Sequence, residues 1–206
     1  MLKRIAVLVS GGGTNLQALL DAQRAGQIRS GRIEVVISNR RDAYALTRAQ
    51  NAGVEALAIT RAKGEGAAEF EARLLDALAA RRIDIIVLAG FLAILSADFV
   101  SHYPDRIINV HPSLIPSFCG KGFYGLRVHE AALAYGVKVT GATVHLVNEI
   151  PDGGRILLQK AVDVLPDDTP ETLQRRVMEQ AEWVLLPRAV EKVAGALARQ
   201  EDTEGN

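Results

Sequence analysis

Short, strongly apolar segments alternate with helical patterns along the first 110 residues of this chain. Apolar runs at 4–9, 33–37, 54–59, 83–88 and 106–110 are separated by stretches whose apolar residues lie three and four positions apart. Strands that alternate with helices in this way pair in parallel and are covered by the helices. The order predicts an α/β fold: a mostly parallel, twisted, Rossmann-like sheet with helices on both faces.

The pattern changes in the second half of the chain. Residues 112–125 form a long loop rich in glycine, proline and aromatic residues, and a short helical pattern follows. Two long strand patterns, 138–147 and 155–164, are separated only by a turn, which predicts an antiparallel strand pair near the C-terminus. Pro170 then opens a long final helix, for which we expect an interruption near Pro187 and a frayed polar tail after residue 200.

The composition of the chain favours no macromolecular partner. Lys plus Arg equals Asp plus Glu, at 24 each, so no net charge draws the chain to a nucleic acid or to an anionic membrane. The longest apolar run, 85–95, is far shorter than the roughly 20 residues that span a bilayer. The first residues lead directly into a strand without a signal-peptide pattern, and Cys119 is the only cysteine. We therefore expect a cytoplasmic protein with no membrane and no nucleic-acid partner.

A glycine-rich turn, Gly11-Gly12-Gly13, joins the first strand to the first helix. Free N–H groups at a helix start and the positive end of the helix dipole bind anions, and Thr14 and Asn15 add side-chain donors. Fingerprints of larger cofactors do not fit, because the third glycine of the dinucleotide motif falls on Leu16 and the Gly-Lys-Ser/Thr of a Walker loop is absent. The turn predicts a site for a single phosphate monoester; the alternative is a tight turn that simply needs glycine.

Asn109 and His111 stand at the end of the fifth apolar run, directly before Pro112. Residues two apart in a strand share one face, and ligands of open α/β sheets bind at this strand end. An amide and an imidazole side by side at this strand end are typical of a pair that hydrogen-bonds a carbonyl oxygen. Asp152, in the turn 150–154, would bring a carboxylate over the sheet edge, where it would favour the imidazolium and so help to stabilise an oxyanion. The alternative for Asp152 is an ordinary turn aspartate before two glycines.

Two other histidines and the cysteine allow more than one interpretation. His129 begins a pattern like that of a zinc-protease helix, but the second histidine is missing, so we expect no metal. His145 lies in a strand pattern, either as a buried core histidine or in the wall of a site. Cys119 would act as a nucleophile only with a base within reach; a packed loop cysteine is the alternative.

Six segments, spread over nearly the whole chain, carry a pattern that is specific when they are taken together. They are Val7–Ala18, Val36–Arg40, Val87–Phe91, Asn109–Leu114, Gly141–His145 and Asp152–Gln159. In this order they resemble the folate-dependent formyltransferase family, and within it the phosphoribosylglycinamide (GAR) formyltransferases. No repeat or linker separates them, so we expect a single formyltransferase domain over residues 1–206. Residues 1–100 would be its sugar-phosphate-binding half, and residues 101–206 its catalytic and folate-binding half.

The resemblance implies transfer of the formyl group of 10-formyltetrahydrofolate to the amine of GAR, by direct attack and without a metal. It carries the catalytic roles onto Asn109, His111 and Asp152. Contacts with the phosphate and ribose fall on Gly12, Gly13, Thr14, Asn15 and Glu182. Contacts with the folate fall on Leu92, Ala93, Ile94, Leu95, Val147 and Asn148. The partners would be these two small substrates, and the protein would be a monomer or a homodimer.

Two departures from the family pattern concern predicted site residues. Ala93 stands where members commonly carry an arginine beside the folate. Between Val177 and Glu182 the chain is one residue longer than is typical, so Glu179 competes with Glu182 for the ribose contact.

Proteins with related or alternative activities would show different sequence features. A 10-formyltetrahydrofolate deformylase, a hydrolase, resembles the same core but usually carries an N-terminal regulatory domain, for which we expect no room before Leu2. A methionyl-tRNA formyltransferase would normally add a C-terminal RNA-binding domain. A sugar-phosphate-binding module would need the glycine turn but not Asn109, His111 and Asp152 together. We therefore expect a GAR formyltransferase, with the deformylase as the alternative.

Overall fold

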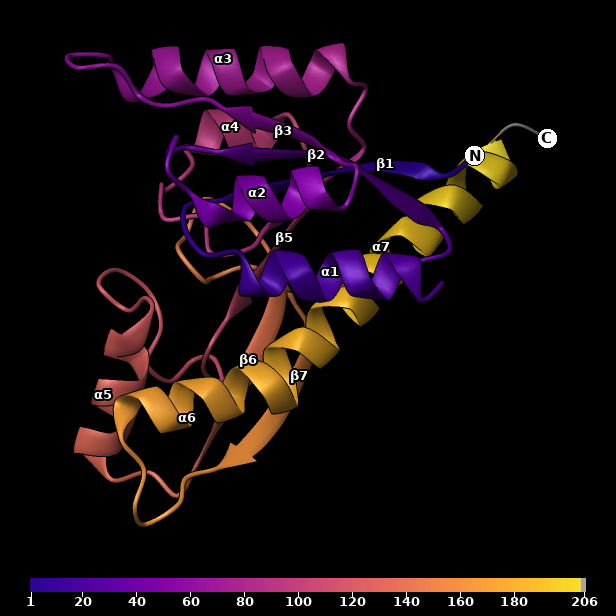
Figure 1. Ribbon diagram of the computed structural model, residues 1–206. Coiled ribbons are helices and arrows are strands. Elements are labelled where there is room, and N and C mark those ends of the chain that lie inside the picture. The colour runs from indigo at the N-terminus through magenta and orange to yellow at the C-terminus, as the bar shows by residue number, and fades with distance from the viewer. Residues whose placement is uncertain (205–206) are drawn as a thin grey trace.

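The computed structural model describes residues 1–204, which form a seven-stranded sheet with helices on both faces (Figure 1). The strands are β1 (Lys3–Val9), β2 (Gly31–Ser38), β3 (Glu55–Ala58), β4 (Ile85–Leu88), β5 (Ile107–His111), β6 (Val139–Leu146) and β7 (Ile156–Asp163). The helices are α1 (Thr14–Arg24), α2 (Tyr44–Asn51), α3 (Ala67–Ala80), α4 (Ala97–Ser101), α5 (Leu126–Tyr135), α6 (Pro170–Val177), η1 (Met178–Glu182) and α7 (Trp183–Glu204).

The strand order in the sheet is β3-β2-β1-β4-β5-β6-β7. The first five strands pair in parallel, whereas β6 runs antiparallel to both β5 and β7. Both the mostly parallel sheet and the antiparallel pair at its C-terminal end are therefore confirmed. Because β2 and β4 lie on opposite sides of β1, the loops after β1 and β4 separate at this point, where ligands of open α/β sheets bind.

Alternating side chains of the central strands supply two apolar cores. In β1, Ile5 and Val7 face one core, which is covered by α1, α2, α6 and α7, and Ala6 and Leu8 face the other, which is covered by α3 and α4. Burial on both faces explains why these strands read as continuous apolar runs. Within residues 1–204, no helix is both long and apolar enough to cross a membrane.

The C-terminal helical segment is interrupted, but not where the sequence suggested. Pro187 lies inside α7, so the predicted break there is wrong. The irregularity comes earlier, at the π-helical turn η1, Met178–Glu182. A π turn holds one residue more than an α turn. This turn lies in the segment between Val177 and Glu182, where the family resemblance predicts one extra residue.

The polar tail is helical through Glu204, so the prediction of a frayed end after residue 200 is wrong for the described residues. An ion pair between the buried Lys3 and Glu201 joins this end of α7 to the start of β1. Residues 205–206 of the predicted tail lie outside the described residues.

Candidate active site

A cavity of about 530 Å³ opens where the parallel strands end. Asn15, shortly after β1, and Gly90, after β4, line it together with Asn109 and His111 of β5. Asp152 reaches the same cavity from the turn between β6 and β7. Its volume suits a small-molecule ligand. Of the predicted phosphate site, Asn15 thus shares this space with Asn109, His111 and Asp152, whereas Gly12, Gly13 and Thr14 are not part of the cavity wall within residues 1–204.

The segment Gly11–Asn15, which we call the glycine turn, starts helix α1. Gly13 caps the helix in a left-handed conformation, with φ +75°. A Cβ added there would also lie 2.7 Å from Cβ of Ala45, so both the dihedral angle and the space require glycine. The tight-turn interpretation therefore holds for Gly13. It does not exclude the anion site, because the first N–H groups of α1 lack partners within the helix.

Asn15 links the glycine turn to Glu182 at the end of η1. Its Nδ2 donates a hydrogen bond of 2.7 Å to Glu182 Oε2. Burial raises the pKa of Glu182 to about 7, although the bond from Asn15 opposes this shift. Glu179, in contrast, is exposed and pairs with Arg175. Of the two candidates for a ribose contact, only Glu182 lines the cavity within residues 1–204.

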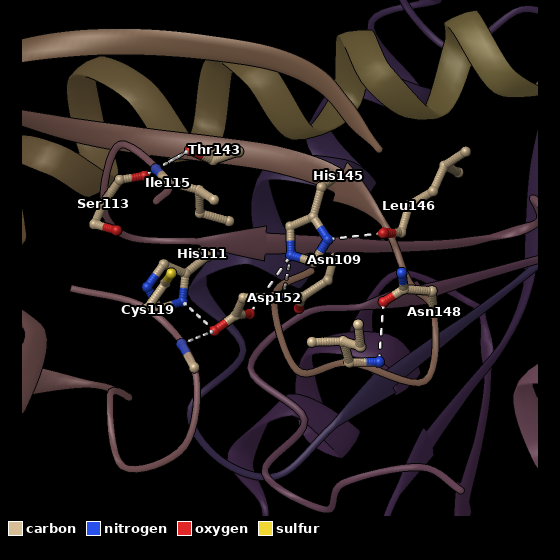
Figure 2. A network of polar contacts seen from close by, with 12 residues as sticks. Asn109, His111, Ser113, Ile115, Cys119, Thr143, His145, Leu146, Asn148 and Asp152 are labelled. Atoms are coloured by element: carbon tan, nitrogen blue, oxygen red, sulfur yellow. Dashed lines mark hydrogen bonds and ion pairs between the residues drawn. The ribbon is translucent and has the colours of Figure 1, made fainter. Parts of the chain in front are cut away.

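Asn109, His111, His145 and Asp152 form what we call the polar cluster (Figure 2). Asn109 and His111 project from the same side of β5, as their spacing predicted. Asp152 lies between two imidazoles: Oδ2 is 3.5 Å from His111 Nδ1, and Oδ1 is 3.5 Å from His145 Nε2. The backbone N–H of Gly120 donates a 2.8 Å hydrogen bond to Oδ2. Asp152 is thus more than an ordinary turn aspartate, because it joins three segments of the chain.

The sequence left the role of His145 open, and the structure places it in the cluster as well as in the core. It is 1% exposed, and it lies directly opposite Asn109 in the antiparallel pair of β5 and β6. Its Nε2 is 3.2 Å from Asn109 Nδ2, and its Nδ1 is 2.8 Å from the carbonyl oxygen of Leu146. The strand register decides this neighbour, and a sequence pattern does not fix a register.

The protonation of His111 differs from the prediction. Burial lowers the pKa of His111, and this effect outweighs the Asp152 carboxylate and the Phe118 carbonyl, which both raise it. The expectation that Asp152 keeps His111 charged is therefore wrong for the free protein. For Asp152 itself, burial raises the pKa, but the hydrogen bond with His145, the charge of His111 and the Gly120 N–H together lower it below its usual range. The carboxylate is therefore ionised at neutral pH.

His129 and Cys119 border the same region without joining the cluster. His129 is fully buried, lines the cavity, and has no hydrogen-bond partner for either ring nitrogen within residues 1–204. Burial, with a further effect of His111, lowers the pKa of His129 to about 4. Burial and the Asp152 charge raise the pKa of the Cys119 thiol, so the thiolate that a nucleophile needs is disfavoured. The packed loop cysteine is the interpretation that fits.

Only some of the residues predicted to contact the folate line the cavity. Leu92, Ala93 and Ile94 line the cavity, and Leu92 and Ile94 expose apolar side chains there. Leu95 and Val147 belong to the core under α3 and α4, because their side chains point into the protein. Asn148 accepts a hydrogen bond of 3.0 Å from Ile150 N–H and so orders the turn before Asp152. Within the described residues, these last three are not part of the cavity wall, which corrects their predicted placement.

Two further segments of the chain form part of the cavity wall. The loop Gly120–Gly125 forms one side, and Gln174 and Met178 of the C-terminal helical segment form another. From its glycines the sequence predicts residues 117–125 as a candidate lid over the substrates, and Gly120–Gly125 falls within that range. No local pattern identifies Gln174 or Met178, because they reach the cavity only through the packing of α6 against α5.

Comparison with known proteins defines the class. The family model described as formyl transferase matches residues 3–190, and the chain therefore belongs to the formyl transferase family. Its solved relatives include glycinamide ribonucleotide transformylase 1 from Symbiobacterium toebii, which is 45% identical with a TM-score of 0.88 over 95% of this chain and 89% of that one. The resemblance seen in the sequence is confirmed.

Two curated relatives narrow the class further. The chain is 38% identical over 179 residues to the chloroplastic phosphoribosylglycinamide formyltransferase of Arabidopsis thaliana, covering 86% of this chain and 61% of the relative. It is 44% identical over 191 residues to the trifunctional purine biosynthetic protein adenosine-3 of Homo sapiens, covering 93% of this chain and 18% of the relative. The chain thus spans less than two thirds of the length of either protein.

Proposed function

We propose that this protein transfers the formyl group of 10-formyltetrahydrofolate to the amine of 5'-phosphoribosylglycinamide in de novo purine biosynthesis. The products are formyl-GAR and tetrahydrofolate. The observation that carries the proposal is that Asn109, His111 and Asp152 of the polar cluster line the same cavity as Asn15 and Glu182, which lie beside the glycine turn. Relatives named for this activity and for purine biosynthesis support it.

The chemistry begins with attack of the substrate amine on the formyl carbon, which places negative charge on the formyl oxygen. Asn109 and His111 are the donors for this oxygen. Burial lowers the pKa of His111, so the ring is neutral in the free protein, and it acts by donating an N–H hydrogen bond without a net change in protonation. This hydrogen bond strengthens as negative charge develops on the formyl oxygen. An interaction that strengthens in this way lowers the barrier more than it tightens substrate binding.

Asn109 has to present an N–H group to the formyl oxygen. In the structure its Nδ2 faces His145 Nε2 at 3.2 Å. His145 Nδ1 donates to the carbonyl oxygen of Leu146 at 2.8 Å, which leaves Nε2 to accept a hydrogen bond from Asn109. An amide Nδ2 carries two hydrogens, so Asn109 can donate one to His145 and the other to the formyl oxygen. His145 thus positions Asn109.

Proton transfer falls to Asp152. The attacking amine must lose a proton, and the folate nitrogen must gain one as the bond to the formyl carbon breaks. An ionised carboxylate held between two imidazoles accepts the first proton and returns it to the leaving nitrogen, directly or through water. No covalent intermediate with the enzyme is needed, and the reaction consumes no net proton.

The substrates are anchored on either side of the cluster. The phosphate lies on the N–H groups of Gly12, Gly13 and the start of α1, beside Thr14. The ribose hydroxyls donate to Glu182 and to Asn15 Oδ1, a buried oxygen without a partner within residues 1–204. The folate ring packs on Leu92, Ala93 and Ile94. In this arrangement residues 1–100 supply most of the phosphate site and residues 101–206 supply the chemistry.

The decisive experiment supplies purified protein with 10-formyltetrahydrofolate, with and without GAR. Tetrahydrofolate is measured by absorbance and formyl-GAR by mass spectrometry. Release of tetrahydrofolate only in the presence of GAR, with an equal amount of formyl-GAR, is the expected result. Equal release without GAR, accompanied by formate, would replace the transferase with the deformylase.

The oligomeric state and the cellular location stay predictions. Sedimentation should find a monomer or a homodimer. A cytoplasmic location stays an expectation from the sequence, and the Arabidopsis thaliana relative is named chloroplastic.

A further inference from the structure

The charges that line the cavity are poorly matched to a phosphorylated substrate. Asp152 and Glu182 contribute carboxyl groups, and the histidines contribute no permanent charge. Among residues 1–204, Lys121 is the only lysine or arginine that lines the cavity. A phosphate monoester carries nearly two negative charges at neutral pH, since its second pKa is about 6. Backbone N–H groups alone would have to balance them at the glycine turn.

Lys121 is free to move toward a ligand. Its side chain is exposed, and within the described residues no carboxylate pairs with it. It lies between two glycines with positive φ, Gly120 at 86° and Gly122 at 96°, which permit backbone conformations closed to other residues. Gly120 is held to Asp152, so the loop is anchored at one end beside the polar cluster.

The contacts around the cavity relate this loop to the glycine turn. Asn15 is hydrogen-bonded to Glu182, and Thr14 Oγ1 lies 3.7 Å from Met178 Sδ, so the turn lies against η1. The loop Gly120–Gly125 leads into α5, which packs beside α6, the helix that continues into η1 (Figure 1). Gln174 and Met178 line the cavity between the two. Lys121 and Asn15, the last residue of the glycine turn, thus line one cavity.

The other cation near the turn is already engaged. Arg48 Nε donates to the carbonyl oxygen of Gly12 at 2.8 Å, and its Nη1 donates to Gln17 Oε1 at 3.0 Å. Arg48 is not part of the cavity wall within residues 1–204. Arg48 is thus bonded to the glycine turn itself, whereas Lys121 lines the cavity without an ion-pair partner among the described residues.

We infer that the ammonium group of Lys121 binds the phosphate of the sugar-phosphate substrate and completes the anion site of the glycine turn. The inference rests on the proposed function. Lys121 is a binding residue for one substrate and takes no part in the chemical step. A lysine suits this role because its flexible stem carries a compact charge that reaches a phosphate without fixed geometry.

The test compares Lys121→Met with Lys138→Met, a matched change of an exposed lysine outside the cavity wall. Steady-state kinetics are measured with GAR and with glycinamide riboside, which lacks the phosphate. In Lys121→Met the KM for GAR should rise about 10- to 100-fold, with kcat and the KM for the folate within about twofold. The riboside should show no such difference, Lys121→Arg should retain most of the affinity, and Lys138→Met should behave like the unaltered protein.

Three results would overturn the inference. They are an unchanged KM for GAR, an equal loss with the riboside, and a rise confined to the KM for the folate, which would assign Lys121 to the folate carboxylates. Calorimetry with ribose 5-phosphate separates this failure from a failure of the proposed function. Without any formyl transfer, weaker binding of ribose 5-phosphate to Lys121→Met than to Lys138→Met still supports the anion site. Equal binding to both variants rejects it.

Discussion

The glycine turn and the polar cluster share one cavity, but they are built in different ways. The turn consists of five consecutive residues, Gly11–Asn15, and its shape follows from a strand that passes directly into a helix. The cluster gathers four side chains from β5, β6 and the turn after β6, and two of its contacts are 3.5 Å long. A local site tolerates changes elsewhere in the fold, whereas an assembled one depends on every segment that it joins.

Removal of the Asp152 carboxylate should have the largest effect, and it tests whether the polar cluster can lose its chemistry while the glycine turn keeps its binding. In Asp152→Asn we expect kcat to fall by about 10²–10⁴-fold, because the proton acceptor is lost, while the dissociation constant of GAR changes little. Rapid-mixing kinetics and calorimetry measure the two quantities. Asp105→Asn is the matched control, since Asp105 is also an aspartate with positive φ but lies at the surface. Full activity in Asp152→Asn would contradict the proton-transfer role.

Glu182 joins the two sites, and its burial has a consequence for pH. Its pKa is raised from 4.5 to about 7, so its contribution to stability is complete below pH 4.5 and is lost as the pH rises through 7. The shift corresponds to about 3 kcal/mol. Glu182→Gln should therefore match the unaltered protein near pH 4.5 and exceed it by up to about 3 kcal/mol at pH 8.

Urea unfolding at a series of pH values measures this difference directly. Any contribution from other groups, such as His129, is common to both proteins and cancels. Glu179→Gln, an exposed change in the same π turn, should show no such growth with pH. If the difference in the free energy of unfolding between Glu182→Gln and the unaltered protein stays constant from pH 4.5 to 8, burial does not raise the pKa of Glu182.

A methyl group at Gly13 should damage the glycine turn and leave the polar cluster intact. Gly13→Ala combines a left-handed φ with a Cβ 2.7 Å from that of Ala45, so we expect a loss of about 1–3 kcal/mol in the free energy of unfolding. The KM for GAR should rise more than kcat falls. Gly11→Ala, with no atom within 4 Å of the added Cβ, is the control. Equal effects of the two changes would remove the argument for a strict glycine.

A change in the π turn η1 should have the smallest effect of these variants. Deletion of the exposed Gln180 should convert η1 to a regular α-helical turn and rotate Glu182 away from Asn15. We expect the KM for GAR to rise about tenfold, the loss of one charge-assisted hydrogen bond, with a smaller change in kcat. Gln180→Ala keeps the length of the turn and serves as the control. A deletion variant with normal KM would show that another part of the helix positions the ribose.

Much of the fold could be predicted because its signals are local. Burial of β1, β2 and β4 on both faces produces continuous apolar runs. In the helices between them, apolar residues recur three and four positions apart. The glycine turn and the pair Asn109 and His111 follow from the same local rules. The π turn was predicted only indirectly: the expected extra residue falls between Val177 and Glu182, but Pro187 was the local signal for an interruption, and only the structure shows that the irregularity is the turn Met178–Glu182.

The sequence by itself identified the candidate residues for the chemistry and the elements that bear them. Tertiary structure decided their neighbours and their charge states. The strand register sets His145 against Asn109, the loop before α5 brings Gly120 to Asp152, and burial lowers the pKa of His111 where a nearby carboxylate alone would raise it. The physical reason is that desolvation and pairing depend on everything packed around a group, and most of that surrounding lies far away along the chain.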